Sequence, residues 1–172
     1  MSVKVLMDVG EYLQTSFDGP DCEYLDGEVV ERNVGELPHA KAQGNIYFLL
    51  RLLAERSGML VVPEVRIRIS STRYRVPDLA VWRNKDIGER IPTEPPFLVV
   101  EILSPEDRIT RVQPKIGEYL SIGVEWIWVV DPIEKNSILY SQQNPVGALT
   151  ETLRTENPVI EIPLAKALDI NS

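Results

Sequence analysis

The chain has 172 residues, of which 44% are hydrophobic and 26% are charged, and its formal net charge at pH 7 is -8. This size and composition predict one globular domain over residues 1–172, with the main core at about residues 38–132. The single cysteine, Cys22, excludes an internal disulfide and a cysteine-rich zinc site, and the acidic charge argues against a protein that simply coats nucleic acid.

The sequence contains no apolar run long enough to span a bilayer and no secretory signal at its N-terminus. We therefore expect a cytoplasmic protein without a membrane partner. The charge is unevenly distributed, because residues 1–38 and 116–172 are acidic whereas residues 39–115 carry a basic excess. This difference is compatible both with chance variation and with a basic surface that meets a polyanion.

The N-terminal part predicts a short helix, a hairpin and a long helix. Residues 8–15 fit the short helix, and Asp26-Gly27 separates two alternating runs within residues 22–31, which is a strong hairpin signal. Pro38 suits a first helical turn, and apolar residues then recur every three or four positions until Gly58. An amphipathic helix is therefore expected between these two residues.

The rest of the chain predicts strands and helices in alternation. The first expected elements are a strand at 59–69 with one polar face, a buried strand at 74–82, a polar loop at 84–96 and a buried strand at 97–103. A helix should follow from 105 to about 122, and it is either kinked at Pro114 or begins there. The last expected elements are a buried strand at 125–132, strands at 136–142 and 150–155, and a short helix at 163–170.

This order places the protein in the α/β (α+β) class with a mixed central sheet. The first three core strands are close in sequence and are expected to form a meander. The strand at 125–132 follows a helix, which favours a parallel crossover. The N-terminal hairpin and the C-terminal strands would flank this core.

Two acidic residues, Asp78 and Glu101, lie inside two of the most apolar stretches of the chain. A buried carboxylate is costly unless a cation or hydrogen bonds compensate its charge. Side chains alternate along a strand, so the two carboxylates converge if their strands pair. The compensating cation could be a protein side chain or a hard divalent metal ion, for which two carboxylates and a carbonyl near Leu103 are suitable ligands. Lys115 on the following helix could project over the strand end and orient a nucleophile or offset developing charge.

These residues form part of a longer pattern that covers roughly residues 8–132. The pattern consists of residues 24–28, His39, Pro77-Asp78, residues 101–105, Lys115 with Tyr119, and residues 123–132. It resembles the Uma-two family of putative restriction endonucleases, which belongs to the PD-(D/E)XK nuclease-like superfamily.

The resemblance implies a restriction-endonuclease-like core of helix, three strands, helix and strand. It implies that Asp78 and Glu101 ligate Mg²⁺ or Mn²⁺, and that the protein is a metal-dependent endonuclease hydrolysing phosphodiester bonds in DNA. The superfamily places a lysine two residues after the second acid, where this chain has Leu103. In the Uma-two pattern the lysine lies on the next helix, which corresponds to Lys115 as the third catalytic residue.

A different interpretation is a catalytically inactive protein with the nuclease fold, in which Asp78, Glu101 and Lys115 form a buried ionic network used for binding or interaction. The acidic surface favours this alternative. A homo-oligomer, a dimer or higher, could hide the acidic ends and would supply two sites for duplex cleavage.

Several other polar residues have two possible roles. His39 is expected to have a surface or a helix-start role but could contact phosphate. Glu64 is expected on a solvated strand face but could be a third metal ligand. Glu28 and Glu31 are expected at the surface. The arginines of the basic segment could meet a phosphate backbone or balance the acids; they are Arg66, Arg68, Arg75, Arg83, Arg108 and Arg111.

Overall fold

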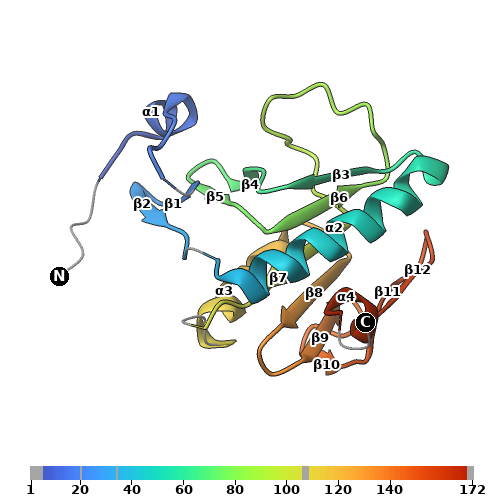
Figure 1. Cartoon of the computed structure of the whole chain (residues 1–172). Coiled ribbons are helices and arrows are strands. Elements are labelled where there is room, and N and C mark those ends of the chain that lie inside the picture. Colours follow the sequence, from blue (N-terminus) through green and yellow to red (C-terminus); the bar gives the residue numbers. More distant parts are fainter. Residues whose placement is uncertain (1–5, 20, 34, 106–108, 170–172) are drawn as a thin grey trace.

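The structure is a computed structural model, and it describes residues 6–19, 21–33, 35–105 and 109–169 (Figure 1). The helices are α1 (Val9–Gln14), α2 (Leu37–Ser57), α3 (Ile109–Ser121) and α4 (Leu164–Ala167). The strands are β1 (Cys22–Leu25), β2 (Glu28–Glu31), β3 (Leu60–Pro63), β4 (Ile67–Ser70), β5 (Arg73–Arg75), β6 (Leu79–Trp82), β7 (Leu98–Ile102), β8 (Trp126–Asp131), β9 (Asn136–Ser141), β10 (Ala148–Leu149), β11 (Thr152–Thr155) and β12 (Ile160–Pro163).

The central sheet has six strands in the order β10-β9-β8-β7-β6-β3. Strands β3, β6 and β7 pair antiparallel as a meander, and β8 pairs parallel to β7 after the crossover through α3. The mixed sheet and the parallel crossover predicted from the sequence are therefore confirmed. Within the described residues, no helix is long and apolar enough to cross a membrane.

Each face of the central sheet is covered by a different set of elements. Side chains of α2, α4 and the β11-β12 hairpin pack on one face, and those of α3 pack on the other. In Figure 1, α2 runs across the front of the sheet. The alternation along β6 shows the two faces, because Leu79 and Val81 join the α2 side whereas Ala80 and Trp82 join the α3 side.

A smaller sheet in the order β2-β1-β5-β4 holds the N-terminal hairpin. Its own apolar cluster centres on Tyr12, Tyr24 and Tyr74, with the rings of Tyr12 and Tyr24 stacked at 4.9 Å between centroids. The turn residues Asp26 and Gly27 both have positive φ, as the predicted hairpin requires. This sheet meets the end of the central sheet and supplies charged side chains to the site described below.

Two strands that the sequence predicts as continuous are each divided between the two sheets. Residues 59–69 form β3 and β4, separated at Glu64, whose φ of 50° is outside the extended region. Residues 74–82 form β5 and β6, separated at residues 76–78, where Pro77 has no N–H to donate to a ladder. The continuous-strand predictions are therefore wrong, and Asp78 lies at a junction rather than inside a strand.

The helices begin and end close to the predicted residues. Gly58 closes α2 with a left-handed φ of 71°, and its N–H donates to the carbonyl of Ala54. Helix α3 already begins at Ile109, so Pro114 lies inside it and is not its first residue. The earlier part of the predicted helix, residues 106–108, lies outside the described residues.

Candidate active site

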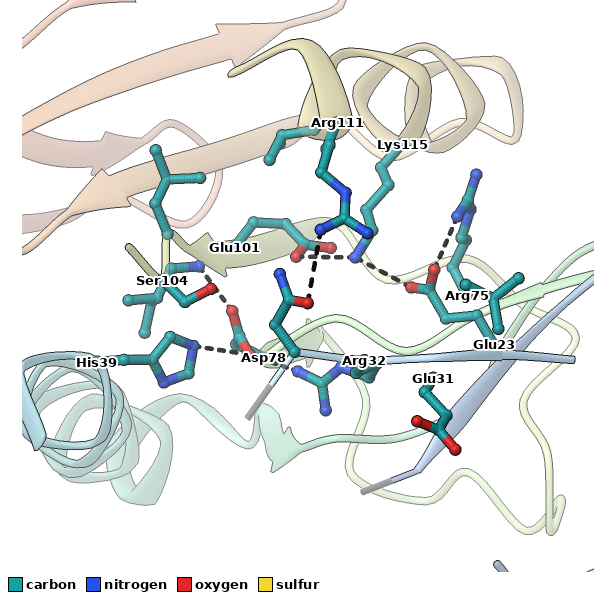
Figure 2. Close-up of a pocket in the computed structure, with 15 residues that line it drawn as sticks. Glu23, Glu31, Arg32, His39, Arg75, Asp78, Glu101, Ser104, Arg111 and Lys115 are labelled. Carbon is teal, nitrogen blue, oxygen red and sulfur yellow. Dashed lines mark hydrogen bonds and ion pairs between the residues drawn. The ribbon is translucent and has the colours of Figure 1, made fainter. Parts of the chain in front are cut away.

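Asp78 and Glu101 come together where β6 and β7 meet. The register pairs Leu79 with Val100, and one further step along each strand brings Asp78 opposite Glu101. Both side chains belong to the α3 face, and both line a cavity of about 150 Å³ (Figure 2). They are almost fully buried, with exposed fractions of 2% and 5%.

Asp78 is held by three donors. Its Oδ2 accepts the backbone N–H of Ile102 at 2.6 Å, and its Oδ1 lies 2.5 Å from Arg32 Nη2 and 3.3 Å from His39 Nε2. Burial by itself would raise the pKa of Asp78, but the hydrogen bond with His39 and the charge of Arg32 hold this pKa below its usual value. Asp78 is therefore a carboxylate in the metal-free protein.

Glu101 has weaker compensation. Its Oε1 accepts from the hydroxyl of Tyr119 at 2.7 Å, and its Oε2 lies 3.4 Å from Lys115 Nζ. Burial raises the pKa of Glu101, the charge of Lys115 opposes this, and the charges of Asp78 and Glu23 raise it further, to about 7. An additional cation beside Glu101 would stabilise its charged form.

Lys115 reaches the cavity from α3, as the sequence predicts for a side chain projecting over the strand end. Its Nζ lies between two carboxylates, 3.0 Å from Glu23 and 3.4 Å from Glu101. Burial would lower the pKa of Lys115, but the charges of Glu101 and Glu23 raise it above its usual value. Lys115 therefore stays protonated and can donate hydrogen bonds, but it cannot serve as a general base.

Glu23 continues the ionic contacts away from the cavity. Its Oε2 accepts from Arg75 Nη1 at 2.7 Å, and its Oε1 accepts from the backbone N–H of Val76 at 3.2 Å. Arg75 Nε donates to Glu118 at 2.5 Å, and Glu118 also pairs with Arg73. The row of alternating charges ends at the exposed hairpin turn, where Arg73 Nε donates to Asp26 at 2.7 Å. We call these seven residues the charge row: Glu101, Lys115, Glu23, Arg75, Glu118, Arg73 and Asp26.

The structure adds residues that the sequence reasoning did not assign to the site. Arg32 and Glu23 come from the N-terminal hairpin region, which is distant in sequence from Asp78 and Glu101. Local sequence patterns therefore give no signal that these two residues reach the site. Of the two roles expected for His39, the structure has the helix-start position, since it lies in the first turn of α2, whereas its side chain is only 11% exposed and contacts Asp78. Tyr119, which is part of the family pattern, holds Glu101.

The other acidic candidates lie around the cavity rather than at its centre. The side chain of Glu64 is 51% exposed, as expected for a solvated position, and it lies 3.5 Å from Arg32 in a neighbouring cavity. Glu31 is exposed at the rim of the carboxylate cavity, and Glu28 is half-buried in β2. The backbone N–H of Glu64 donates to the carbonyl of Asp78 at 3.3 Å, so Glu64 lies opposite Asp78, while its carboxylate pairs with Arg32.

Several of the arginines balance acids, which is one of the two roles expected for them, and contact with a phosphate backbone stays a prediction. Arg75 is buried among carboxylates, and Arg83 pairs with Glu125 at 2.6 Å, so both balance acids. Arg66 lies over the ring of Tyr12 at 4.6 Å and 3.7 Å from Asp21. Arg111, by contrast, lines the carboxylate cavity, with its Nη1 3.5 Å from Asn33. Arg108 lies outside the described residues.

The donor set of the cavity fits magnesium better than metals that need a complete protein cage. In the described part of the chain, no group of three or more His, Cys, Asp or Glu side chains gathers around a common metal position. Mg²⁺ is commonly held by one or two carboxylates, with waters and substrate phosphates completing its octahedron. Asp78 and Glu101 provide that number of carboxylates in one cavity.

Comparison with known proteins gives one family and a solved structure. The sequence model of the Uma2 family, described as "Putative restriction endonuclease", matches residues 9–170. The fold is similar to the crystal structure of a putative nuclease belonging to DUF820 from Anabaena variabilis. The TM-score is 0.79 and the sequence identity 19%, and the match covers 98% of each chain. No curated protein matches the chain.

The charge row predicts that Glu23 stabilises the fold in addition to holding the ammonium group of Lys115. Replacing Glu23 by Gln leaves the buried Arg75 and Lys115 with one carboxylate each, so we expect the free energy of unfolding to fall by about 3 kcal/mol. Urea denaturation at pH 7 measures this loss. The matched control is Asp26→Asn at the exposed end of the same row, for which little change is expected. Equal small losses in both variants would contradict the prediction.

The raised pKa of Glu101 predicts a pH effect on stability in the metal-free protein. Between the usual value of 4.5 and about 7, Glu101 keeps its proton in the folded state and loses it in the unfolded chain. The folded state binds more protons in this window, so the contribution of Glu101 to stability falls as the pH rises through it. With a chelator present, the free energy of unfolding of the wild type minus that of Glu101→Gln should decrease from pH 4.5 to 7 and then level off. A constant difference over this range would show that Glu101 titrates normally.

Proposed function

Because the chain belongs to the Uma2 family of putative restriction endonucleases, we propose that it is a divalent-metal-dependent endonuclease that hydrolyses phosphodiester bonds in DNA. The observation that supports this most strongly is the meeting of two buried carboxylates, Asp78 and Glu101, in one cavity with a protonated Lys115 beside them. Buried carboxylates and a lysine from neighbouring elements are a costly arrangement, which is typical of functional sites.

Asp78 and Glu101 would hold the metal ion, Mg²⁺ or Mn²⁺. When bound, such an ion supplies Lewis-acid activation of water and offsets the charge that develops on the phosphate. The backbone N–H of Ile102 fixes the orientation of Asp78, and the hydroxyl of Tyr119 fixes that of Glu101. Both side chains are thus held in fixed orientations, which would limit the conformational entropy lost if a metal ion binds.

Lys115 would donate hydrogen bonds to the attacking water or to a phosphate oxygen. Its raised pKa keeps the ammonium charged, because Glu101 and Glu23 both favour that form. Glu23 also determines where the ammonium lies, since its Oε1 is the nearer of the two carboxylate partners. A preorganised cation of this kind stabilises negative charge in the transition state without reorganisation during the reaction.

The cavity also explains how an acidic chain could accept a polyanion. Its lining carries four basic side chains, Arg32, Arg75, Arg111 and Lys115, beside four acidic ones, so the cavity is less acidic than the chain as a whole. Charges focused in a cleft of low dielectric act on a substrate more strongly than the net charge of the whole protein does. The net charge of -8 therefore does not exclude a DNA substrate.

An inactive nuclease fold is the alternative, and one observation favours it. Both oxygens of Asp78 are already occupied by protein donors, as a purely structural ionic network would require. The geometry of Glu101 favours metal binding instead, because its Oε2 lies as far as 3.4 Å from its partner Lys115 and is therefore weakly compensated.

We expect purified protein with Mg²⁺ or Mn²⁺ to nick or cut plasmid DNA, and Asp78→Asn and Glu101→Gln to reduce the rate at least 100-fold. A preorganised electrostatic group is worth about 10²–10³ in rate, so Lys115→Met should lose about as much. Gel analysis of supercoiled, nicked and linear plasmid measures each rate. The control is Glu161→Gln, an exposed change on β12 outside the cavity, which should cleave at the wild-type rate.

The proposal would be contradicted if wild type and Asp78→Asn were equally inert on duplex DNA, single-stranded DNA and RNA. Activity on RNA alone would retain the metal-dependent mechanism and replace the substrate.

A further inference from the structure

Arg32 occupies an unusual position directly after β2. Its side chain is only 12% exposed, and its guanidinium reaches the carboxylate cavity, where Nη2 lies 2.5 Å from Asp78 Oδ1. Figure 2 shows His39 and Arg32 reaching Asp78 from two different sides, with Lys115 above them in the view. Arg32, together with His39, therefore compensates the charge of the buried Asp78 in the metal-free protein.

We propose that Arg32 holds the place of the metal ion in the metal-free protein, that its guanidinium leaves Asp78 when a divalent ion binds, and that it then contacts the substrate phosphate. This inference rests on the proposed function, since it assigns Arg32 a role in metal binding and cleavage at the same site.

The competition follows from the oxygen that the two cations share. The N–H of Ile102 fixes Asp78 Oδ2 at 2.6 Å, so Oδ1 is the oxygen whose partner can change. A magnesium ion binds an oxygen at about 2.0–2.1 Å, which would place a double positive charge next to a guanidinium that is itself 2.5 Å from that oxygen. Repulsion between the two cations in a poorly hydrated cavity makes simultaneous binding unfavourable.

Arg32 also has a second acidic partner, which its guanidinium could keep after it leaves Asp78. Its Nη1 already lies 3.5 Å from Glu64 Oε1, and Arg32 lines both the carboxylate cavity and the neighbouring one that contains Glu64. The side chain of Glu64 is 51% exposed, so this partner lies toward the solvent, from which a substrate would approach. A guanidinium presents a planar fork of donors that matches phosphate oxygens, so a released Arg32 is suited to bind a phosphodiester.

The exchange makes two predictions of opposite sign for Arg32→Gln. Removing the competing cation should tighten Mn²⁺ binding by about tenfold or more, within the usual range of coupling between two ligands. Losing a charged contact to phosphate should slow cleavage at saturating Mn²⁺ by about tenfold or more. If Arg32 only supported the fold, its replacement by Gln would weaken Mn²⁺ binding and also slow cleavage.

Isothermal titration with Mn²⁺, without DNA, measures the first effect, and plasmid cleavage measures the second. The matched control is Arg66→Gln, because Arg66 has nearly the same side-chain exposure, 14%, and pairs with Asp21 outside the carboxylate cavity. We expect Arg66→Gln to leave the Mn²⁺ affinity and the cleavage rate unchanged. Arg32→Lys keeps the competing charge and should bind Mn²⁺ with an affinity close to that of the wild type.

The inference is overturned if Arg32→Gln binds Mn²⁺ with unchanged or lower affinity while wild type binds and Asp78→Asn does not. If Arg32→Gln fails to fold, ¹⁵N NMR of the arginine side chains in the wild type replaces it. The Arg32 signal, assigned with Arg32→Lys, should shift on addition of Mg²⁺ while that of Arg66 stays, and an unmoved Arg32 signal overturns the exchange. Absence of Mn²⁺ binding to the wild type would instead overturn the proposed function.

Discussion

The burial of three carboxylates in one small region is the constraint on which the rest of the site depends. Glu23, Asp78 and Glu101 are each no more than 5% exposed, and an uncompensated charge in such a place is strongly destabilising. The fold compensates Asp78 and Glu23 well, with pKa values below the usual range, but leaves Glu101 with a raised pKa. Burial is the largest cause of this raised pKa, so Glu101 is the least compensated of the three carboxylates, and this is the physical reason to propose a cation in this cavity.

The meeting of the two sheets places these charges together. Glu23 comes from the small N-terminal sheet, Glu101 comes from the middle of the central sheet, and Asp78 lies at the junction between β5 and β6. Lys115 on α3 then contacts carboxylates from both sheets. The N-terminal hairpin is therefore part of the site, and its contribution through Glu23 and Arg32 distinguishes this arrangement from a site built by the central sheet alone.

The central part of the site could be predicted from the sequence because its signal is local. A carboxylate within an apolar stretch is unusual, and alternation brings positions 78 and 101 to one face because the register of β6 and β7 extends to Asp78, one residue before β6. The contributions of Glu23 and Arg32 could not be predicted, because they depend on how the hairpin docks onto the core over a large sequence separation. The division of residues 59–69 was also missed, since the apolar alternation continues across Glu64 although the backbone turns there.

A crystal of the protein soaked in Mn²⁺ tests the central claim most directly, through the anomalous difference map at the cavity. The account predicts a peak within bonding distance of both Asp78 and Glu101, with the Arg32 guanidinium moved away from Asp78, and no such peak in crystals of Asp78→Asn. A wild-type map without a peak between these carboxylates, and with Arg32 still bound to Asp78, would contradict it.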